Sequence, residues 1–505
     1  MAHSNPVNLQ ELKSKAVTGS IWAVIEKFSL QIVQFVVGVV LARLLEPKDY
    51  GLIALTGIFT SISAAITDGG FEKTLIQKKD LSPLQISTVF YVNVMLGALM
   101  AVLLILFAPS IARFFNAPKL VPVLRVVSLG LFINAFGQTQ RTLLMKELHF
   151  KKISYAQITS SVIGGIAGVT LAYNGAGVWA LVFSGLISQV VMLSFFWIRS
   201  SWYPIFQFSY GSIKQMLPYG YNILFSSLVF FSIQQFNTFI VGRYYSKTDL
   251  GLFNRGSRFP ELVTSIIESV ILKMSFPLFA KLQDDDDQLI RVLKKTVKLA
   301  AFISFPLLAT LLIDAKDITI VLFTQKWIGS VIFLEAFCLV KLLHPFVAIY
   351  REVILSRGKA YLLTRILVVT TSLEVLLVLF LIRYGIFYVI VASLSSIVVQ
   401  YIIYIFFVGG TLPLHWYTHM NWLRPYFLNA LLLILVTIVV DRLISGFIGY
   451  LPLKLLIKVF FGMLSYISMA YVFKFDEFAY FKLVFQSIRK KFNLKQSSLS
   501  TNYGS

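Results

Sequence analysis

The sequence predicts an all-α protein that crosses a membrane about fourteen times, with two six-helix lobes followed by two further helices. Hydrophobic residues make up 57% of the chain and charged residues 13%, and the mean hydropathy is +0.79. Apolar runs of helical length recur with short connections from Thr18 to Phe473. A soluble chain of 505 residues would instead divide into several domains joined by polar linkers. These observations indicate one polytopic membrane protein.

The first apolar run, residues 18–45, follows a polar tail of residues 1–17. It is too long for the core of a signal peptide, so we expect it to stay as a span. The later runs have the length that a helix needs to cross the hydrocarbon core. They are residues 50–67, 84–108, 121–144, 153–173, 177–198, 216–242, 250–276, 299–313, 332–355, 361–382, 386–408, 426–440 and 451–472. We expect lobes at 18–200 and 201–410, two additional helices at 411–473 and a basic tail at 474–505.

The positions of lysine and arginine predict that both termini are cytoplasmic, because the connections on that side are richer in basic residues. The formal net charge of +22 could suggest nucleic acid, but the basic residues fall in loops and tails. Anionic lipid headgroups and membrane topology explain the excess better. The outer connections hold fewer basic residues, which are Arg43, Lys48, Arg113, Lys119, Lys247, Lys316, Lys326, Arg383, Arg442 and Lys454.

The chain also contains a weak internal repeat. ARLLEPKDYGLIAL from Ala42 aligns with GRYYSKTDLGLFNR from Gly242, which pairs Asp49 with Asp249 and Gly51 with Gly251. Further along, Arg141 falls on Arg351 and Gly175 on Gly385. Transporters commonly place their substrate site at the interface between two such halves. The repeat therefore favours a transport function.

Three segments carry a resemblance to a known family. They are ARLLEPKDYGLIAL, the run RTLLMKELHFKKISYAQI with GAGVWALV after it, and DLGLFNRGSRFPELVTSIIESVILKMSFPLFAKLQDD. These segments resemble the polysaccharide transporter (Wzx-type) family of the multidrug/oligosaccharidyl-lipid/polysaccharide flippase (MOP) superfamily, close to its colanic-acid and teichuronic-acid exporter branch. The resemblance runs from about Ser14 to the twelfth span.

The resemblance implies a V-shaped, MATE-like fold of two six-helix lobes in the bacterial inner membrane. It also implies a flippase that uses alternating access to move undecaprenyl-pyrophosphate-linked oligosaccharide units of O-antigen, capsule or exopolysaccharide to the outer leaflet. We expect no enzymatic activity, no cofactor and no metal centre. The coupling proton or cation stays open, as does the question whether a polymerase and assembly proteins take part.

Ionisable residues inside apolar segments are the candidate site residues, since charge is costly in hydrocarbon and is expected to face a wet cavity or the protein interior. A pyrophosphate needs basic partners to leave water. The candidate substrate-binding residues are Arg255, Arg258, Arg141, Arg351, Arg125 and Lys341. The candidates for ion coupling or charge balance are Glu26, Asp68, Glu261, Glu268 and Glu335.

Structural roles compete with these assignments. Arg141 and Arg351 can instead anchor their helices at the cytoplasmic interface. For Arg255 and Arg258 the alternative is a helix-start cluster at the outer interface, beside a kink at Pro260. Gly164 and Gly168 are predicted to let two helices pack closely.

Three rival functions stay open. A glycan polymerase or ligase would also be polytopic and basic, but it needs a large outer loop that this sequence lacks. A MATE-like small-molecule antiporter would share the fold and would line its cavity with carboxylates and aromatic residues. A lipid-linked peptidoglycan precursor flippase is the nearest rival, because its substrate carries the same pyrophosphate.

Overall fold

The computed structural model describes residues 9–78, 80–200 and 202–477, with side chains from residue 27 onward except 219, 270 and 272–274. Across this part of the chain the secondary structure is helical, and thirteen segments are long and apolar enough to cross a membrane. The expected eighth span lies in α9 (Lys247–Lys281), a helix of 35 residues that is not among these thirteen. At 1.5 Å per residue that helix is about 50 Å long, which exceeds the ~30 Å hydrocarbon core. The predicted all-α, polytopic fold class is confirmed.

The chain forms two compact units, which are described separately. The N-terminal unit covers residues 1–254 and the C-terminal unit covers residues 255–505. The lobe boundaries expected from the sequence stay a prediction. The first unit contains the start of α9 and the helices α1 (Leu9–Leu44), α2 (Pro47–Asp68), α3 (Phe71–Gln77), α4 (Pro83–Phe114), α5 (Leu120–Lys146), α6 (Phe150–Tyr173), α7 (Val178–Ile198) and α8 (Tyr210–Tyr244).

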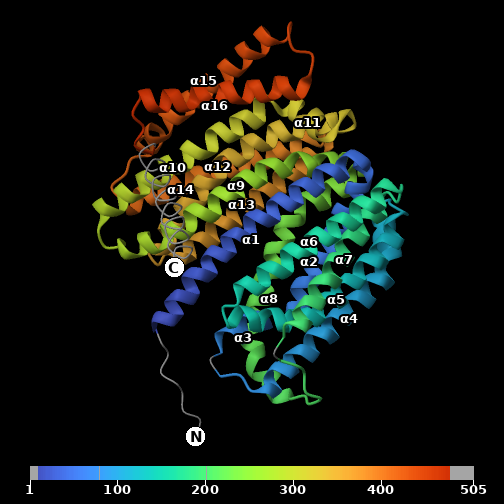
Figure 1. The fold of residues 1–505 in the computed structure, drawn as a ribbon. Helices are drawn as coiled ribbons and strands as arrows, with labels where there is room; N and C mark the ends of the chain where they lie inside the picture. Colours follow the sequence, from blue (N-terminus) through green and yellow to red (C-terminus); the bar gives the residue numbers. More distant parts are fainter. Residues whose placement is uncertain (1–8, 79, 201, 478–505) are drawn as a thin grey trace, which may run out of the picture. The chain divides into compact units, whose positions relative to one another are not determined.

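Helix α2 packs against α4, α5 and α8 in the N-terminal unit. Helix α1 packs on α6, and α6 runs beside α7 (Figure 1). Small residues permit the α6–α7 approach, since a Cβ at Gly164 would lie 1.8 Å from Ser188 Oγ. The Ser184 hydroxyl of α7 also donates a hydrogen bond to the Gly164 carbonyl at 2.8 Å. The close packing predicted for the Gly164–Gly168 face is confirmed.

Each copy of the internal repeat contains a helix start that an aspartate caps in the same way. In α2 the Asp49 carboxylate accepts a hydrogen bond from the Glu46 N–H at 3.2 Å. In α9 Asp249 accepts from the Ser246 N–H at 3.3 Å and from its hydroxyl at 2.7 Å. Each carboxylate therefore satisfies an N–H at a helix start that has no partner within its own helix.

These two helix starts also contact each other through reciprocal glycines. A Cβ at Gly51 would lie 1.8 Å from the Lys247 carbonyl oxygen, and one at Gly251 would lie 1.9 Å from the Pro47 carbonyl oxygen. Because Pro47 and Lys247 are themselves equivalent in the repeat, the contact has local two-fold pseudosymmetry. The glycines that matched in the alignment are the residues that let the two backbones touch.

Among the described residues, the C-terminal unit contains the rest of α9, seven α-helical or 3₁₀ elements, and a terminal hairpin of α15 and α16. Helix α10 packs on α12 and α15, and α15 packs on α16 as the red hairpin of Figure 1. The elements are α10 (Asp286–Ile313), α11 (Ala315–Phe323), η1 (Gln325–Ser330), α12 (Val331–Ser356), α13 (Ala360–Leu381), η2 (Ile382–Tyr384), α14 (Phe387–Thr411), α15 (Trp416–Ile444) and α16 (Leu451–Val472).

Helix α10 begins well before the expected ninth span. The acidic run that precedes it supplies the cap, since Asp285 accepts a hydrogen bond from the Gln288 N–H at 2.9 Å. The basic run 291–298 belongs to the same helix, in which Leu289, Leu293 and Val297 are buried on one face.

Candidate functional site

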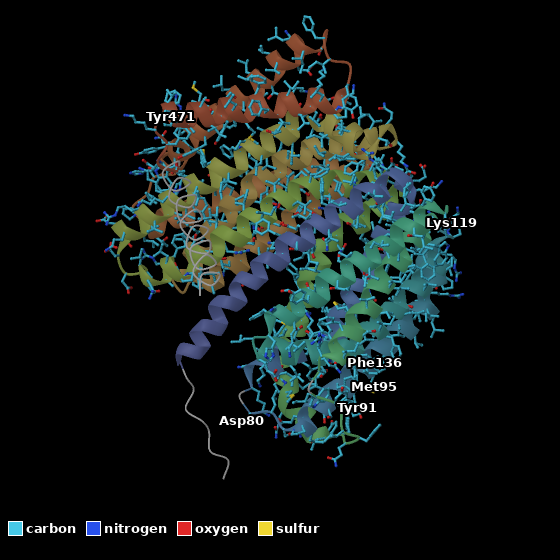
Figure 2. The ribbon with its side chains drawn as sticks, viewed as in Figure 1. Asp80, Tyr91, Met95, Lys119, Phe136 and Tyr471 are labelled. Carbon is cyan, nitrogen blue, oxygen red and sulfur yellow. The ribbon has the colours of Figure 1, made fainter. Side chains whose placement is uncertain are left out.

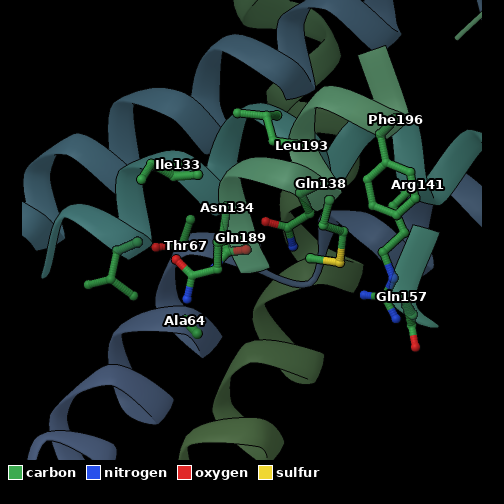
Figure 3. A pocket seen from close by; sticks show the side chains of 13 residues that line it. Ala64, Thr67, Ile133, Asn134, Gln138, Arg141, Gln157, Gln189, Leu193 and Phe196 are labelled. Carbon is green, nitrogen blue, oxygen red and sulfur yellow. The ribbon is translucent and has the colours of Figure 1, made fainter. Parts of the chain in front are cut away.

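A cavity with a mixed polar and apolar lining lies inside the N-terminal unit, between α2, α5, α6 and α7 (Figure 3). Its volume is about 390 Å³, within the range of small-molecule sites. Polar side chains from all four helices reach it. They are Thr67 of α2, Asn134, Gln138 and Arg141 of α5, Gln157 of α6 and Gln189 of α7.

Helix α5 supplies three of these six polar side chains, because Asn134, Gln138 and Arg141 recur at intervals of four and three residues, on one helix face. Gly130 leaves room for the neighbouring helix, since a Cβ there would lie 2.4 Å from Gln189 Oε1. The indole N–H of Trp197 donates to the Phe136 carbonyl at 3.0 Å and fixes α7 against α5. The cavity walls are thus held by packing and by hydrogen bonds.

Acidic residues at the end of α2 and in α3 balance the cavity arginine. Arg141 lies 3.9 Å from Glu72 Oε1, with 40% of the arginine side chain exposed. Gln138 Nε2 donates to Asp68 Oδ1 at 2.7 Å. Gly69 and Gly70, with φ of 54° and 74°, make the left-handed turn that separates α2 from α3. This turn places Asp68 and Glu72 beside α5.

The structure brings together two of the N-terminal candidates and keeps a third apart. Asp68 contacts Gln138, which lines the same cavity as Arg141. Arg125 is exposed on α5, sixteen residues before Arg141, which is about 24 Å along the helix. Glu26 lies outside the residues whose side chains the structure describes.

In the C-terminal unit Arg255 of α9 stacks on aromatic rings. Its guanidinium carbon lies 3.8 Å from the ring centroid of Phe323 and 5.5 Å from that of the buried Trp327. Such a stack holds the flat cation in one orientation. Arg258, one turn further along α9, is exposed. The two arginines therefore have different surroundings.

The other C-terminal candidates lie on α9 and α12, where ion pairs involve Lys341, Glu261 and Arg351. Lys341 Nζ of α12 lies 3.9 Å from Glu261 Oε1 of α9, which joins a predicted binding residue to a predicted charge-balancing one. Arg351 pairs with its neighbour Glu352 at 3.1 Å and is exposed. Glu268 and Glu335 are half-buried on α9 and α12. The functional roles of all these residues stay predictions.

Sequence reasoning missed two polar groups. The first group consists of neutral amides, which a search for charge in apolar runs does not find: Asn134, Gln138, Gln157 and Gln189. The spacing of Asn134 and Gln138 on α5 was the available signal. The second group surrounds the buried Lys458 of α16, whose Nζ lies 2.7 Å from Asp314 and Asp317 and 3.2 Å from Asp441. That group joins α16 to the α10–α11 junction and to α15.

The fold resembles that of known lipid and drug transporters. A solved structure titled "Lipid II flippase MurJ, inward closed conformation" matches with a TM-score of 0.71 at 15% identity, covering 91% of this chain and 99% of that one. An inward-facing multidrug resistance MATE family transporter of the MOP superfamily matches with a TM-score of 0.57 at 17% identity, covering 76% and 95%. The chain is a multi-pass membrane protein with the MOP fold.

The chain belongs to the polysaccharide biosynthesis protein family, whose model matches residues 40–332. It is 26% identical to the lipopolysaccharide biosynthesis protein WzxC of Escherichia coli (strain K12), over 66% of this chain and 68% of that protein. It is 26% identical to the teichuronic acid biosynthesis protein TuaB of Bacillus subtilis (strain 168), over 70% and 73%. It is 25% identical to the succinoglycan biosynthesis transport protein ExoT of Rhizobium meliloti (strain 1021), over 63% and 64%.

Proposed function

We propose that this protein is a flippase that moves polyprenyl-pyrophosphate-linked oligosaccharide units from the cytoplasmic to the outer leaflet of the bacterial inner membrane. The observation that carries the proposal is the cavity of the N-terminal unit, whose lining combines an arginine with four neutral amides inside an apolar helical unit. Its support comes from family membership and from relatives whose names refer to lipopolysaccharide, teichuronic acid and succinoglycan biosynthesis.

The chemistry of the cavity suits both parts of a sugar phosphate. Amide groups donate and accept hydrogen bonds, which matches the hydroxyls of a saccharide. The Arg141 guanidinium matches a phosphate oxygen pair with its fork of donors. The carboxylates of Asp68 and Glu72 hold this side of the cavity polar when no substrate is bound, and Asp68 is our first candidate for a coupling proton or cation.

The C-terminal unit is proposed to supply a second set of phosphate partners. Arg255 is stacked on Phe323, which holds the plane of its guanidinium in one orientation. Arg258 and Glu261 lie on the same helix as Arg255, and Lys341 of α12 pairs with Glu261. We propose that the glycolipid undergoes no covalent change during transport and that both termini are cytoplasmic.

Two other functions are compatible with the fold alone. A peptidoglycan precursor flippase and a drug antiporter share the MOP fold, as the two structural matches illustrate. The family match and the polysaccharide relatives favour the oligosaccharide substrate over both.

Complementation of a strain that lacks its own exporter tests the proposal, with surface polysaccharide and membrane-inserted protein measured together. A charge-assisted hydrogen bond is worth about 1.5–3 kcal/mol, so Arg141→Ala is expected to lower export roughly tenfold at equal abundance. Arg141→Lys retains part of the activity because it keeps the charge without the fork. Lys214→Ala, an exposed change at the start of α8, is the matched control. Full export by Arg141→Ala would remove the cavity arginine from the mechanism.

A further inference from the structure

A second cavity lies at the other end of the N-terminal unit, where α2, α5, α7 and α9 begin. We call it the lysine cavity. Figure 2 labels Lys119, which lines it, and Asp80, which precedes α4, at opposite ends of this unit. The volume is about 750 Å³, within the range of small-molecule sites. The function proposed above makes no use of it.

The lysine cavity carries an excess of positive charge. Among the described residues that line it are Lys48, Lys119 and Lys247, against the single carboxylate of Asp49. That carboxylate already accepts the Glu46 N–H as a helix cap. Three ammonium groups around one cavity repel each other, so an anion between them would lower the electrostatic free energy.

Lys247 is fixed in place more firmly than the two exposed lysines. Its Nζ donates to the Gly242 carbonyl at 2.8 Å, at the end of α8, and lies 6.0 Å from the Phe115 ring centroid. Burial and the nearby Arg243 lower the pKa of Lys247. A bound anion would offset both effects, because it would stabilise the charged ammonium.

An indole ring forms part of the same lining. Trp179, in the first turn of α7, is half-buried, and its ring centroid lies 5.9 Å from that of Phe183. A half-buried indole offers a flat apolar surface next to a wet space. The C–H face of a sugar ring is flat and apolar too, whereas the acyclic headgroup of phosphatidylglycerol has no such face.

We propose that the lysine cavity binds an anionic saccharide, with a sugar ring on Trp179 and a carboxylate or phosphate among Lys48, Lys119 and Lys247. This inference rests on the proposed function, since the ligand would be the glycan of the transported lipid. In the proposed orientation the cavity is on the outer side, where the glycan leaves the protein. An anionic phospholipid headgroup shares the charge, and the test separates the two ligands.

Full-length protein in phosphatidylcholine nanodiscs is titrated with two probes, a glucuronate-containing hyaluronan tetrasaccharide and neutral chitotetraose, by isothermal titration calorimetry. We expect the anionic probe to bind at least fivefold more tightly, with an affinity that falls as salt is raised. Each exposed charge contact is worth about 0.2–1 kcal/mol, so the Lys48→Ala, Lys119→Ala double variant is expected to bind roughly fivefold more weakly. Arg113→Ala removes an exposed charge at the same end outside the lining, and a change within twofold is expected.

The Trp179→Ala and Trp179→Phe pair separates a saccharide from a lipid headgroup. Loss of the ring is expected to weaken tetrasaccharide binding about fivefold, and Trp179→Phe is expected to restore part of it. Thermal unfolding of each variant shows whether it folds. If the double lysine variant does not fold, Lys119→Gln, an exposed single change, replaces it. Equal binding of the two probes, or equal loss in Arg113→Ala and in the double lysine variant, would overturn the proposal.

Competition and transport give the remaining outcomes. If phosphatidylglycerol in the nanodisc displaces the tetrasaccharide and Trp179→Ala has no effect, the site is a headgroup site and the saccharide assignment is wrong. If wild-type protein flips a polyprenyl-pyrophosphate glycolipid but binds neither probe, this inference fails and the proposed function stands. If no glycolipid is flipped while the tetrasaccharide still binds, the proposed function fails first.

Discussion

Substitution of the reciprocal glycines is expected to destabilise the N-terminal unit, because each faces the backbone of the equivalent helix start. A Cβ at Gly51 would lie 1.8 Å from the Lys247 carbonyl oxygen, whereas real Cβ contacts essentially never fall under 3.0 Å. The backbone would therefore have to move by about 1.2 Å. Overpacking of this kind costs about 1–3 kcal/mol, and we expect the upper part of that range because backbone cannot rotate aside.

Thermal unfolding of purified protein in detergent measures the effect. A loss of about 2–3 kcal/mol corresponds to a Tm lower by roughly 4–6 °C for a unit of this size. Gly57→Ala is the matched control on the same helix, since a Cβ there meets nothing within 4 Å. It is expected to be neutral or to stabilise by up to about 1 kcal/mol, the helix-propensity difference.

The pseudosymmetry of the contact leads to a second prediction. Gly251→Ala is expected to cost as much as Gly51→Ala, because its Cβ would lie 1.9 Å from the Pro47 carbonyl oxygen. The double variant should cost less than the sum, since one backbone shift relieves both overlaps. If Gly51→Ala unfolds at the same temperature as Gly57→Ala, the two helix starts do not touch as described.

Two further predictions concern the C-terminal unit and the topology. Lys458→Met leaves three aspartates without their shared partner and is expected to cost about 3–5 kcal/mol in unfolding free energy. The control, Lys316→Met, changes an exposed lysine and is expected to be neutral. Equal melting curves of the two variants would contradict the buried network. Cysteines placed at Lys151 and Lys359 are expected to react with an impermeant maleimide only from the cytoplasm, and one at Asn116 only from outside. Reversed labelling would overturn the proposed orientation.

The arrangement of helices could be predicted from the sequence more fully than the site could. Apolar length fixes where a helix can cross a membrane, and it located the spans. It placed the start of the ninth span at Leu299, but α10 begins at Asp286. The first part of α10 is amphipathic, so it has the periodicity of a helix but not the hydropathy of a membrane span. The alignment paired Gly51 with Gly251, yet only the folded chain shows that each faces the other's helix start.

The polar groups could not be predicted from a single sequence, because the fold brings together residues that are far apart along the chain. Gln138 is one of many amides, and its contact with Asp68 joins residues seventy positions apart. The Lys458–Asp317 pair spans 141 positions, so no local pattern predicts it. Charged residues in apolar runs were easier to find, because the cost of burying charge limits how many such residues a membrane helix can carry.

Transport of a defined glycolipid by purified protein tests the central claim most directly. Proteoliposomes are loaded with a fluorescent polyprenyl-pyrophosphate oligosaccharide, and lectin accessibility on each leaflet is followed over time. Wild-type protein is expected to move the intact lipid between leaflets, Arg141→Ala roughly tenfold more slowly, and Lys214→Ala at the wild-type rate. Movement no faster than in protein-free liposomes, or release of free polyprenyl pyrophosphate, would contradict the assignment as a flippase.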